Sequence, residues 1–533
     1  MAFKKKPTTS KDVFVLTLPL RCDVSQLDQL DKLFRCCNSI KNALIRKELS
    51  SLKQLERTRA WKVLQADIAA SYKAEEAEKV ASKRSAIRAD RKLLFQQRKA
   101  LLETYGFTAS DFEKAVKPMQ KHYRKIVHSQ VAQKISADVW KMFNDYLYGK
   151  GSEIHFSKSV DFFTVEGKSN TTGICYENEV VLIGKKLRIP VIRNKKDWFG
   201  YETEALSRDV HYCRIMRKPG PHRWLYFVQL VLAGTPPIKV DKRTGEIMHT
   251  LGKGRVGNDI GPQTLATVSD GSVSLVVLGD RTQDIQKELR RINRAMDRSR
   301  RATNPEMFND KGEIVPIDKL PDTCISVIRG KKRRRWVESK RYKQLAQYRR
   351  YLYRKQADQR KQSHNELVNK LLSLGDTHYI ETMNWQALAK RSKKTEVSEK
   401  TGRFKRKKRF GRSIANKAPG LFMVIYERKV KASGGKFFRI NTWAAKASQF
   451  DHSTKAYKKK HLSTRWHTLV DGTKVQRDLY SAFLIQNTNE ALDGFLQPLL
   501  DEKFEQFKEC HDAEIQRLQH SLTPSSTGVR KVA

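Results

Sequence analysis

The stretch RVGNDIGPQTLATVSDG, residues 255 to 271, places one acidic residue, Asp259, at the end of a short apolar run. The pair Asp270-Gly271 then separates the alternating runs TLATVS and VSLVVLG, which is a strong signal for a β-hairpin. Three antiparallel strands are therefore predicted, and the strand-like runs THYIE and FFRINTW follow between helical stretches. This order predicts an α/β layer structure for the region.

The charge balance of the whole chain points to an anionic partner. Its 533 residues include 106 Lys and Arg against 57 Asp and Glu, a net charge of +49. The positive side chains repel one another unless an anion is bound, which favours nucleic acid as the partner. A basic packaging protein satisfies the same total. With 39% hydrophobic residues the chain can bury real cores, and it has no apolar run of about 18 residues, which argues against a membrane span.

The seven cysteines are scattered and form no C-x-x-C pair. This pattern predicts reduced thiols, a cytoplasmic setting and no zinc site.

Changes in hydrophobic periodicity and in Gly and Pro content along the sequence predict a multidomain α+β protein. The run VFVLTLPL within residues 1–24 reads as a first strand, and residues 25–149 have helical periodicity. Residues 150–250 contain short strand-like runs with Gly and Pro between them, which predicts a small β-barrel or a sandwich. We take the barrel as the expected form, with the helical region inserted after its first strand. The α/β region covers 251–500, and 501–533 reads as a helix and a disordered tail.

Three acidic residues stand where an RNase H-like sheet would bring them together. Asp259 and Glu381 end predicted strands, and Asp478 lies in the helical run KVQRDLYSAFL. Each alone is more often a solvated residue. In an RNase H-like sheet, however, the first strand lies beside the fourth and the last helix crosses their ends. Converging carboxylates need a cation, and two Mg²⁺ ions could activate water and stabilise the leaving oxygen of a phosphodiester.

The segments VGNDIGPQTLATVSDG, HYIETMNWQALAKRS and KVQRDLYSAFLI resemble, in order and spacing, the three RuvC motifs of the TnpB/OrfB transposon-encoded nucleases. They are similar as well to those of the related type V CRISPR effectors. The resemblance is strongest over 254–490, and the upstream regions follow that family's layout of wedge and recognition domains. It implies a RuvC-like nuclease domain at 251–500, with Asp259, Glu381 and Asp478 as catalytic metal ligands.

The function implied by the resemblance is RNA-guided cleavage of DNA. A guide RNA would be held on the basic surface, and double-stranded and then single-stranded target DNA would be bound after a short flanking motif is read. A non-cleaving RNA-guided repressor and a transposase-associated DNA-binding protein are the alternatives. The expected location is the prokaryotic cytoplasm, near the nucleoid, and whether two copies act together is left open.

One segment departs from the family pattern. Members commonly carry a zinc ribbon between the second and third motifs, which corresponds here to residues 444–474. The four expected cysteine places hold Asp451, Thr454, His467 and Val470, and Val470 cannot bind zinc. A metal-free remnant is therefore predicted, so structural zinc is not expected. A site built from His452, His461 and His467 is a less favoured alternative, and Trp443 and Trp466 are predicted to pack around the remnant.

Two segments concentrate positive charge. Residues 331–361 hold 14 basic and 2 acidic residues, interleaved with aromatic residues, and residues 390–412 hold 12 basic and 2 acidic residues. The second segment corresponds to a lid beside the active site in the family, and a nuclear localisation signal is its competing interpretation. The predicted nucleic-acid contacts are Arg333, Arg334, Arg335, Arg349, Arg350, Lys405, Arg406, Lys407, Arg409 and Arg477.

Overall fold

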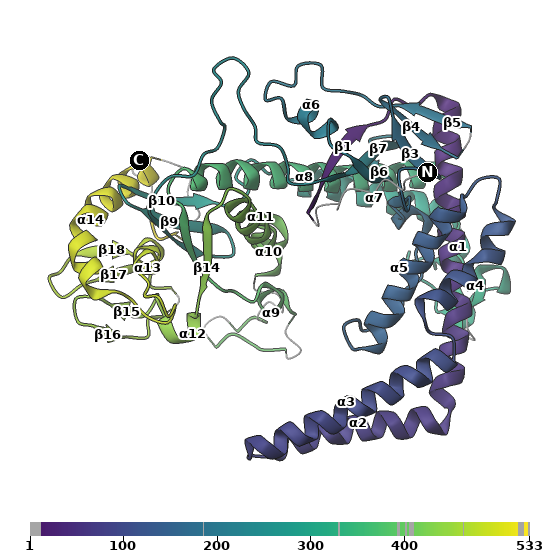
Figure 1. The fold of residues 1–533 in the computed structure, drawn as a ribbon, viewed down its shortest axis with the longest axis horizontal. Helices are drawn as coiled ribbons and strands as arrows, with labels where there is room; N and C mark the ends of the chain where they lie inside the picture. Colours follow the sequence, from purple (N-terminus) through teal and green to yellow (C-terminus); the bar gives the residue numbers. More distant parts are fainter. Residues whose placement is uncertain are drawn as a thin grey trace, which may run out of the picture. The chain divides into compact units, whose positions relative to one another are not determined.

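The computed structural model describes residues 12–184, 186–328, 331–391, 395–399, 402–404, 410–461, 463–520 and 527–530. The chain divides into two compact units, Met1–Gly245 and Glu246–Ala533. Figure 1 labels their helices and strands. No helix among these residues is both long enough and apolar enough to cross a membrane.

The first unit joins a helical region to two small sheets. Its helices are α1 (Val24–Arg57), α2 (Arg59–Ala77), α3 (Ala81–Thr104), α4 (Ala109–His122), α5 (Ser129–Leu147) and α6 (Tyr201–Leu206). Its strands are β1 (Val13–Pro19), β2 (Thr164–Glu166), β3 (Ile174–Glu177), β4 (Val180–Ile183), β5 (Leu187–Pro190), β6 (Val210–Pro219) and β7 (Trp224–Ala233). Strand β1 pairs with β7, so the start of the chain and the region beyond residue 150 build one sheet.

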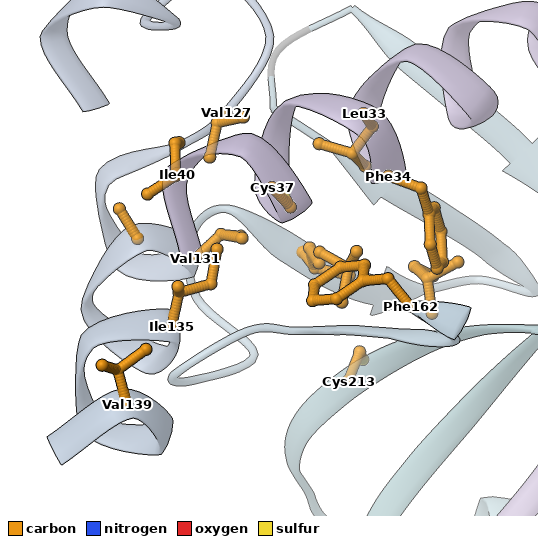
Figure 2. Close-up of a cluster of buried hydrophobic side chains, with 14 of the residues drawn as sticks. Leu33, Phe34, Cys37, Ile40, Val127, Val131, Ile135, Val139, Phe162 and Cys213 are labelled. Atoms are coloured by element: carbon orange, nitrogen blue, oxygen red, sulfur yellow. The ribbon is translucent and has the colours of Figure 1, made fainter. Parts of the chain in front are cut away.

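The sheets and helices of this unit share one core. Alternate residues of β1 are buried, as expected for a strand with one face on the core. Figure 2 shows Leu33, Phe34 and Cys37 of α1 in the same cluster as Val131 and Ile135 of α5. The sheet thus provides the floor on which α1 and α5 pack.

The predicted barrel does not close among the described residues. One sheet has the order β1-β7-β6-β2, and β3-β4-β5 form a separate three-stranded sheet. Strand β2 has only three residues and pairs only with β6, so it leaves an edge that β1 does not reach. A bridge between Leu20 and Val191 joins the ends of β1 and β5, but no strand pairing among the described residues closes the opposite side between β2 and β3. The expectation of a β-barrel is therefore wrong, and open sheets take its place.

The second unit is built on a five-stranded sheet of order β10-β9-β8-β13-β14 (Figure 1). Its strands are β8 (Arg255–Ile260), β9 (Thr264–Ser269), β10 (Ser272–Val277), β13 (Thr377–Glu381) and β14 (Lys436–Ile440). Strand β9 pairs antiparallel with both β8 and β10, and Ser269 lies opposite Ser272 across the Asp270-Gly271 turn. Strand β13 is parallel to both β8 and β14.

Helices cover both faces of this sheet. They are α7 (Gln286–Thr303), α8 (Lys340–Leu372), α9 (Trp385–Ala389), α10 (Gly411–Lys417), α11 (Pro419–Ala432), α12 (Thr442–Ala445), α13 (Arg477–Gln486) and α14 (Gln497–Gln519). One core contains residues of α8 and α11, and another contains residues of α13 and α14. Helices α10 and α11 are separated at Ala418, because Pro419 begins a new helix there and restricts the residue before it.

Short hairpins complete the unit. Strands β11 (Ile325–Ile328) and β12 (Lys331–Arg334) lie between α7 and α8 in sequence, beside a small core that includes Met307, Leu320 and Cys324. Strands β15 (Phe450–Asp451), β16 (Ala456–Tyr457), β17 (Trp466–Thr468) and β18 (Lys474–Gln476) form two hairpins in the remnant segment.

The predicted disordered tail is ordered over its described residues, 527–530. The indole nitrogen of Trp466 donates to the carbonyl oxygen of Gly528 at 3.0 Å, and Gln476 Nε2 donates to that of Thr527 at 3.1 Å. Val529 is buried in the core that contains α13 and α14. These contacts hold residues 527–530 in place, and the rest of the predicted tail beyond residue 520 lies outside the described residues.

Candidate active site at the carboxyl edge of the second sheet

Two of the three predicted carboxylates lie side by side on neighbouring parallel strands. The register pairs Asn258 of β8 with Ile380 of β13, so the next residues are Asp259 and Glu381. Paired positions of parallel strands point to the same face of a sheet. Asp259 and Glu381 therefore share one face, at the ends of their strands.

Helix α13 covers that same face because Gly257 has no side chain. A Cβ atom on Gly257 would lie 2.1 Å from the carbonyl oxygen of Ala482 and 2.3 Å from the amide nitrogen of Gln486. Any other residue would push the helix away. The side-chain nitrogen Nε of Arg255 donates to the carbonyl oxygen of Gln486 at 2.7 Å, which fixes the carboxyl end of α13 over the start of β8.

This docking places the first turn of α13 over the end of β8. Two residues of strand, from Gly257 to Asp259, advance about 6.6 Å, and four residues of helix, from Ala482 back to Asp478, advance about 6 Å. Because the helix runs antiparallel to β8, Asp478 lies above Asp259. The side chain of Gln476 accepts from the amide of Leu479 at 2.8 Å and caps the helix at this point.

The electrostatics of the three acids agree with this placement. Burial, and then the carboxylates of Glu381 and Asp478, raise the pKa of Asp259 well above its usual range, while the guanidinium of Arg477 opposes the rise. Burial also raises the pKa of Glu381 to about 7. Charged carboxylates are therefore unfavourable here without a cation.

Arg477 supplies one such positive charge from within the chain. Its Nη2 lies 3.2 Å from Oδ1 of Asp478, and its Nη1 donates to the carbonyl oxygen of Thr464 at 3.0 Å. The guanidinium predicted to contact nucleic acid is thus engaged with the third carboxylate. No group of three or more His, Cys, Asp or Glu side chains in the described part of the chain is already assembled as a metal site.

The opposite face of the same strands carries a buried hydrogen-bonded chain. Thr267 Oγ1 donates to Asn258 Oδ1 at 2.9 Å, and Asn258 Nδ2 lies 3.1 Å from the hydroxyl of Tyr426. That hydroxyl is 2.7 Å from His378 Nδ1, and His378 Nε2 is 3.0 Å from the carbonyl oxygen of Gly375.

The carbonyl at the end of this chain fixes its proton positions. A carbonyl oxygen can only accept, so His378 Nε2 carries the proton and the Tyr426 hydroxyl donates to Nδ1. Burial lowers the pKa of His378 to about 4, in keeping with a neutral ring. The chain ties β8, β9, β13 and α11 together behind the acids.

Side-chain contacts hold the remnant segment together. His467 Nε2 lies 3.1 Å from Asp451 Oδ2, which joins the two hairpins, and His452 Nδ1 lies 2.7 Å from the hydroxyl of Tyr480. His461 instead contacts Ser463. His452 and His467 both lie against the ring of Tyr480, with ring centroids 5.7 and 5.1 Å from that of the tyrosine, whereas His461 has a separate partner. Trp466 is partly buried, whereas Trp443 is 89% exposed, so the prediction that Trp443 packs is wrong.

The predicted basic contacts have different surroundings. Arg333 and Arg335 are exposed, whereas Arg334 Nη2 donates to the carbonyl oxygen of Val315 at 2.7 Å. Arg349 donates to Asn293 Oδ1 at 2.9 Å and so joins α8 to α7, and Arg350 is partly exposed. Lys405, Arg406, Lys407 and Arg409 lie outside the described residues.

Two cationic surfaces escaped the sequence analysis. On α7, a surface cavity of about 640 Å³ is lined by Lys287, Arg290, Arg291, Arg294 and Arg298, with Asp284 and Glu288. The sequence pattern that could have predicted this surface is the helical spacing of its cations, which lie opposite the apolar stripe that packs on α8.

In the first unit, a cavity of about 800 Å³ is lined by Lys32, Arg124, Lys125 and Lys186, with no acidic side chain among its lining residues. These cations come from distant parts of the chain, so no local sequence pattern predicts that they group together. Both cavities present positive charge suited to phosphates.

No protein-family model matches the chain, and no curated protein sequence matches it. Several solved structures share similarity with it, including two complexes. One is "Cryo-EM structure of the Cas12f1-sgRNA-target DNA complex", with 10% identity, 89% of this chain and 99% of that chain covered, and a TM-score of 0.39. The other is "Cryo-EM structure of CRISPR-Cas12f Ternary Complex", with 13% identity, coverage of 83% and 82%, and a TM-score of 0.22. At these scores the likeness assigns neither a function nor a ligand.

Proposed function

We propose that the chain is an RNA-guided DNA endonuclease whose second unit, RuvC-like by its sequence motifs, hydrolyses phosphodiester bonds with divalent metal. The observation that carries the proposal is the grouping of Asp259, Glu381 and Asp478. Burial, and then repulsion from the other two carboxylates, raise the pKa of Asp259, an arrangement that is costly unless a cation is bound.

The donor set fits magnesium. Carboxylate oxygens are its preferred protein ligands, and Mg²⁺ is commonly held by one or two carboxylates plus water and phosphate oxygens. Asp259 and Glu381 would hold the metal from the sheet, and Asp478 would approach from α13. When bound, Mg²⁺ would supply charge stabilisation for the phosphodiester undergoing cleavage.

The remaining residues of the site position these acids. Gly257 permits the close approach of α13, and the capped first turn orients Asp478. Arg477 balances the charge of Asp478 while no metal is bound, and its guanidinium could then turn to a phosphate. We assign no general base among the side chains.

Guide RNA and target DNA are the proposed partners. The chain carries a net charge of +49, and cations line a cavity in each unit. Such surfaces contact phosphates without reading sequence, which leaves sequence reading to base pairing with a guide.

The test is guided cleavage. The full chain would be purified with the RNA it retains, that RNA sequenced, and plasmids carrying the matching target and randomised flanks offered in Mg²⁺ or EDTA. We expect cuts in Mg²⁺ only, next to one short motif. Asp259→Ala should abolish them, while Asp310→Ala, which removes an exposed acid of the same unit, should not.

A non-cleaving RNA-guided DNA-binding protein is the second candidate. One observation favours it: the carboxylate of Asp478 is paired with the guanidinium of Arg477 at 3.2 Å, which competes with metal binding. The same assay separates the two functions. Target binding with no cuts at any Mg²⁺ concentration would support the second candidate and refute the nuclease.

A further inference from the structure

The indole of Trp443 is unusually exposed to solvent. The side chain is 89% exposed, more than any other large apolar side chain that the structure describes. Tryptophan is highly buried on average, and an exposed aromatic ring commonly marks a contact surface. The question is what covers the ring.

The backbone beneath the indole is held firmly. Trp443 lies in α12, just after β14, and the side chain of Asn441 accepts from the amide of Trp443 at 3.2 Å. The amide of Asn441 in turn donates to the carbonyl oxygen of Leu492 at 2.8 Å. The ring is therefore presented by an ordered segment, not by a loose loop.

The same segment is attached to the candidate active site. Thr442 Oγ1 accepts from the amide of Thr382 at 3.3 Å, and Thr382 directly follows Glu381. Ile440, at the end of β14, is paired with Glu381, and Figure 1 shows α12 directly after this strand.

The reach from the acids to the ring is short. Three residues beyond Ile440 extend the chain by at most about 11 Å, and neighbouring strands are about 5 Å apart. The Cα atom of Trp443 thus lies within about 16 Å of that of Glu381, the length of about five stacked nucleotides at 3.4 Å each.

The surroundings of Trp443 suit single-stranded nucleic acid. Lys446, three residues along, is exposed and makes no ion pair with the residues that the structure describes. Met383, which follows Thr382, is also exposed, at 37%. Aromatic rings beside cations are the elements with which proteins bind unpaired strands, because every base has a face that can stack.

We propose that Trp443 is a stacking platform for one unpaired base of the DNA strand that enters the acidic site. The inference rests on the proposed function, since it names a substrate contact for that site. A partner protein could also cover an exposed indole. A base is favoured because the ring is anchored within about 16 Å of Glu381, in a chain with a net charge of +49.

The experiment measures binding without cleavage. A labelled single-stranded oligothymidine would be titrated with the full chain in EDTA, together with an oligonucleotide of the same length that lacks all its bases. The variants are Trp443→Ala, Trp443→Phe and, as a matched control, Val470→Ala, which shortens another exposed apolar side chain of this unit.

Stacking of one base corresponds to about 5- to 150-fold in affinity. We expect Trp443→Ala to lose affinity for oligothymidine by a factor in this range, Trp443→Phe to keep most of it, and Val470→Ala to match the wild type. The base-free strand should bind wild type and Trp443→Ala equally, because no base is left to stack.

Two outcomes would overturn the inference. Equal affinity of Trp443→Ala and wild type for oligothymidine would do so, as would an equal loss for both strands. Altered self-association of Trp443→Ala with unchanged DNA affinity would indicate a protein contact instead. Because the assay needs no metal and no guide, failure of the nuclease proposal would appear separately, as absent cleavage with stacking intact.

Discussion

Replacing Glu381 with glutamine should stabilise the metal-free protein at neutral and alkaline pH. Burial raises the pKa of this carboxyl from 4.5 to about 7. At about 1.4 kcal/mol per pKa unit, keeping the charged form in the folded protein costs up to about 3 kcal/mol. The amide carries no charge and keeps the shape of the side chain, so Glu381→Gln should recover most of that free energy of unfolding.

The effect has a defined pH window. The folded protein holds the Glu381 proton more tightly than the unfolded chain, so this contribution is complete below about pH 4.5 and is lost as the pH rises through about 7. His378 acts in the opposite direction, because its pKa is lowered to about 4 and acid therefore destabilises the fold below about pH 6.5. His378 is present in both proteins, so its contribution cancels in the difference between wild type and Glu381→Gln.

The assay is urea denaturation of wild type and Glu381→Gln in EDTA from pH 5 to 8. Glu490→Gln, which neutralises an exposed acid of the same unit, is the control. We expect the stability difference for Glu381→Gln to grow across this range to about 3 kcal/mol, and Mg²⁺ to stabilise the wild type more than the variant. Parallel pH profiles for the two proteins would refute the reasoning.

Three further predictions follow from the same geometry. Gly257→Ala should displace α13 and destabilise the unit by about 1–3 kcal/mol with loss of cleavage. Gly261→Ala should not, because its new Cβ would meet Thr264 Oγ1 at 3.3 Å and the carbonyl oxygen of Thr264 at 3.6 Å. Equal melting temperatures for the two variants would contradict the packing argument. Tyr426→Phe should cost about 1–3 kcal/mol in urea denaturation, because it leaves Nδ1 of His378 without its buried donor and removes one of the hydrogen bonds of Asn258. A cost near zero would contradict the proton assignment. The purified protein should contain no stoichiometric zinc by elemental analysis, and EDTA should leave its melting temperature unchanged. His467→Ala should lower the melting temperature, because it removes the Asp451–His467 contact. A zinc-dependent melting transition would refute the view that this contact stabilises the remnant segment without metal.

Local chemistry made part of the fold predictable. The Asp270-Gly271 turn specified the β9–β10 hairpin, because Gly271 adopts the positive φ of 76° that such turns require. The strand character of THYIE was likewise evident from its sequence and is found in β13. In contrast, whether the strands of the first unit close into a barrel depends on pairing between distant edges, which no local pattern specifies.

The candidate site also combines features that the sequence predicts with features that only the structure reveals. The three carboxylates could be proposed from their order along the chain, but the feature that brings α13 onto β8, the missing side chain of Gly257, becomes visible only with the helix in place. The exposure of Trp443 was missed because its segment was expected to fold over it. The pairing of Arg477 with Asp478 was missed because Arg477 was predicted to contact nucleic acid.

Manganese offers the most direct test of the metal site. Mn²⁺ substitutes for Mg²⁺ at oxygen ligands, and its anomalous scattering locates it in crystals. Crystals of the full chain soaked in MnCl₂ should show anomalous density between the carboxylates of Asp259, Glu381 and Asp478, and crystals of Asp259→Ala should not. Density absent from this position in the wild type, or unchanged in Asp259→Ala, would contradict the assignment of these three acids as metal ligands.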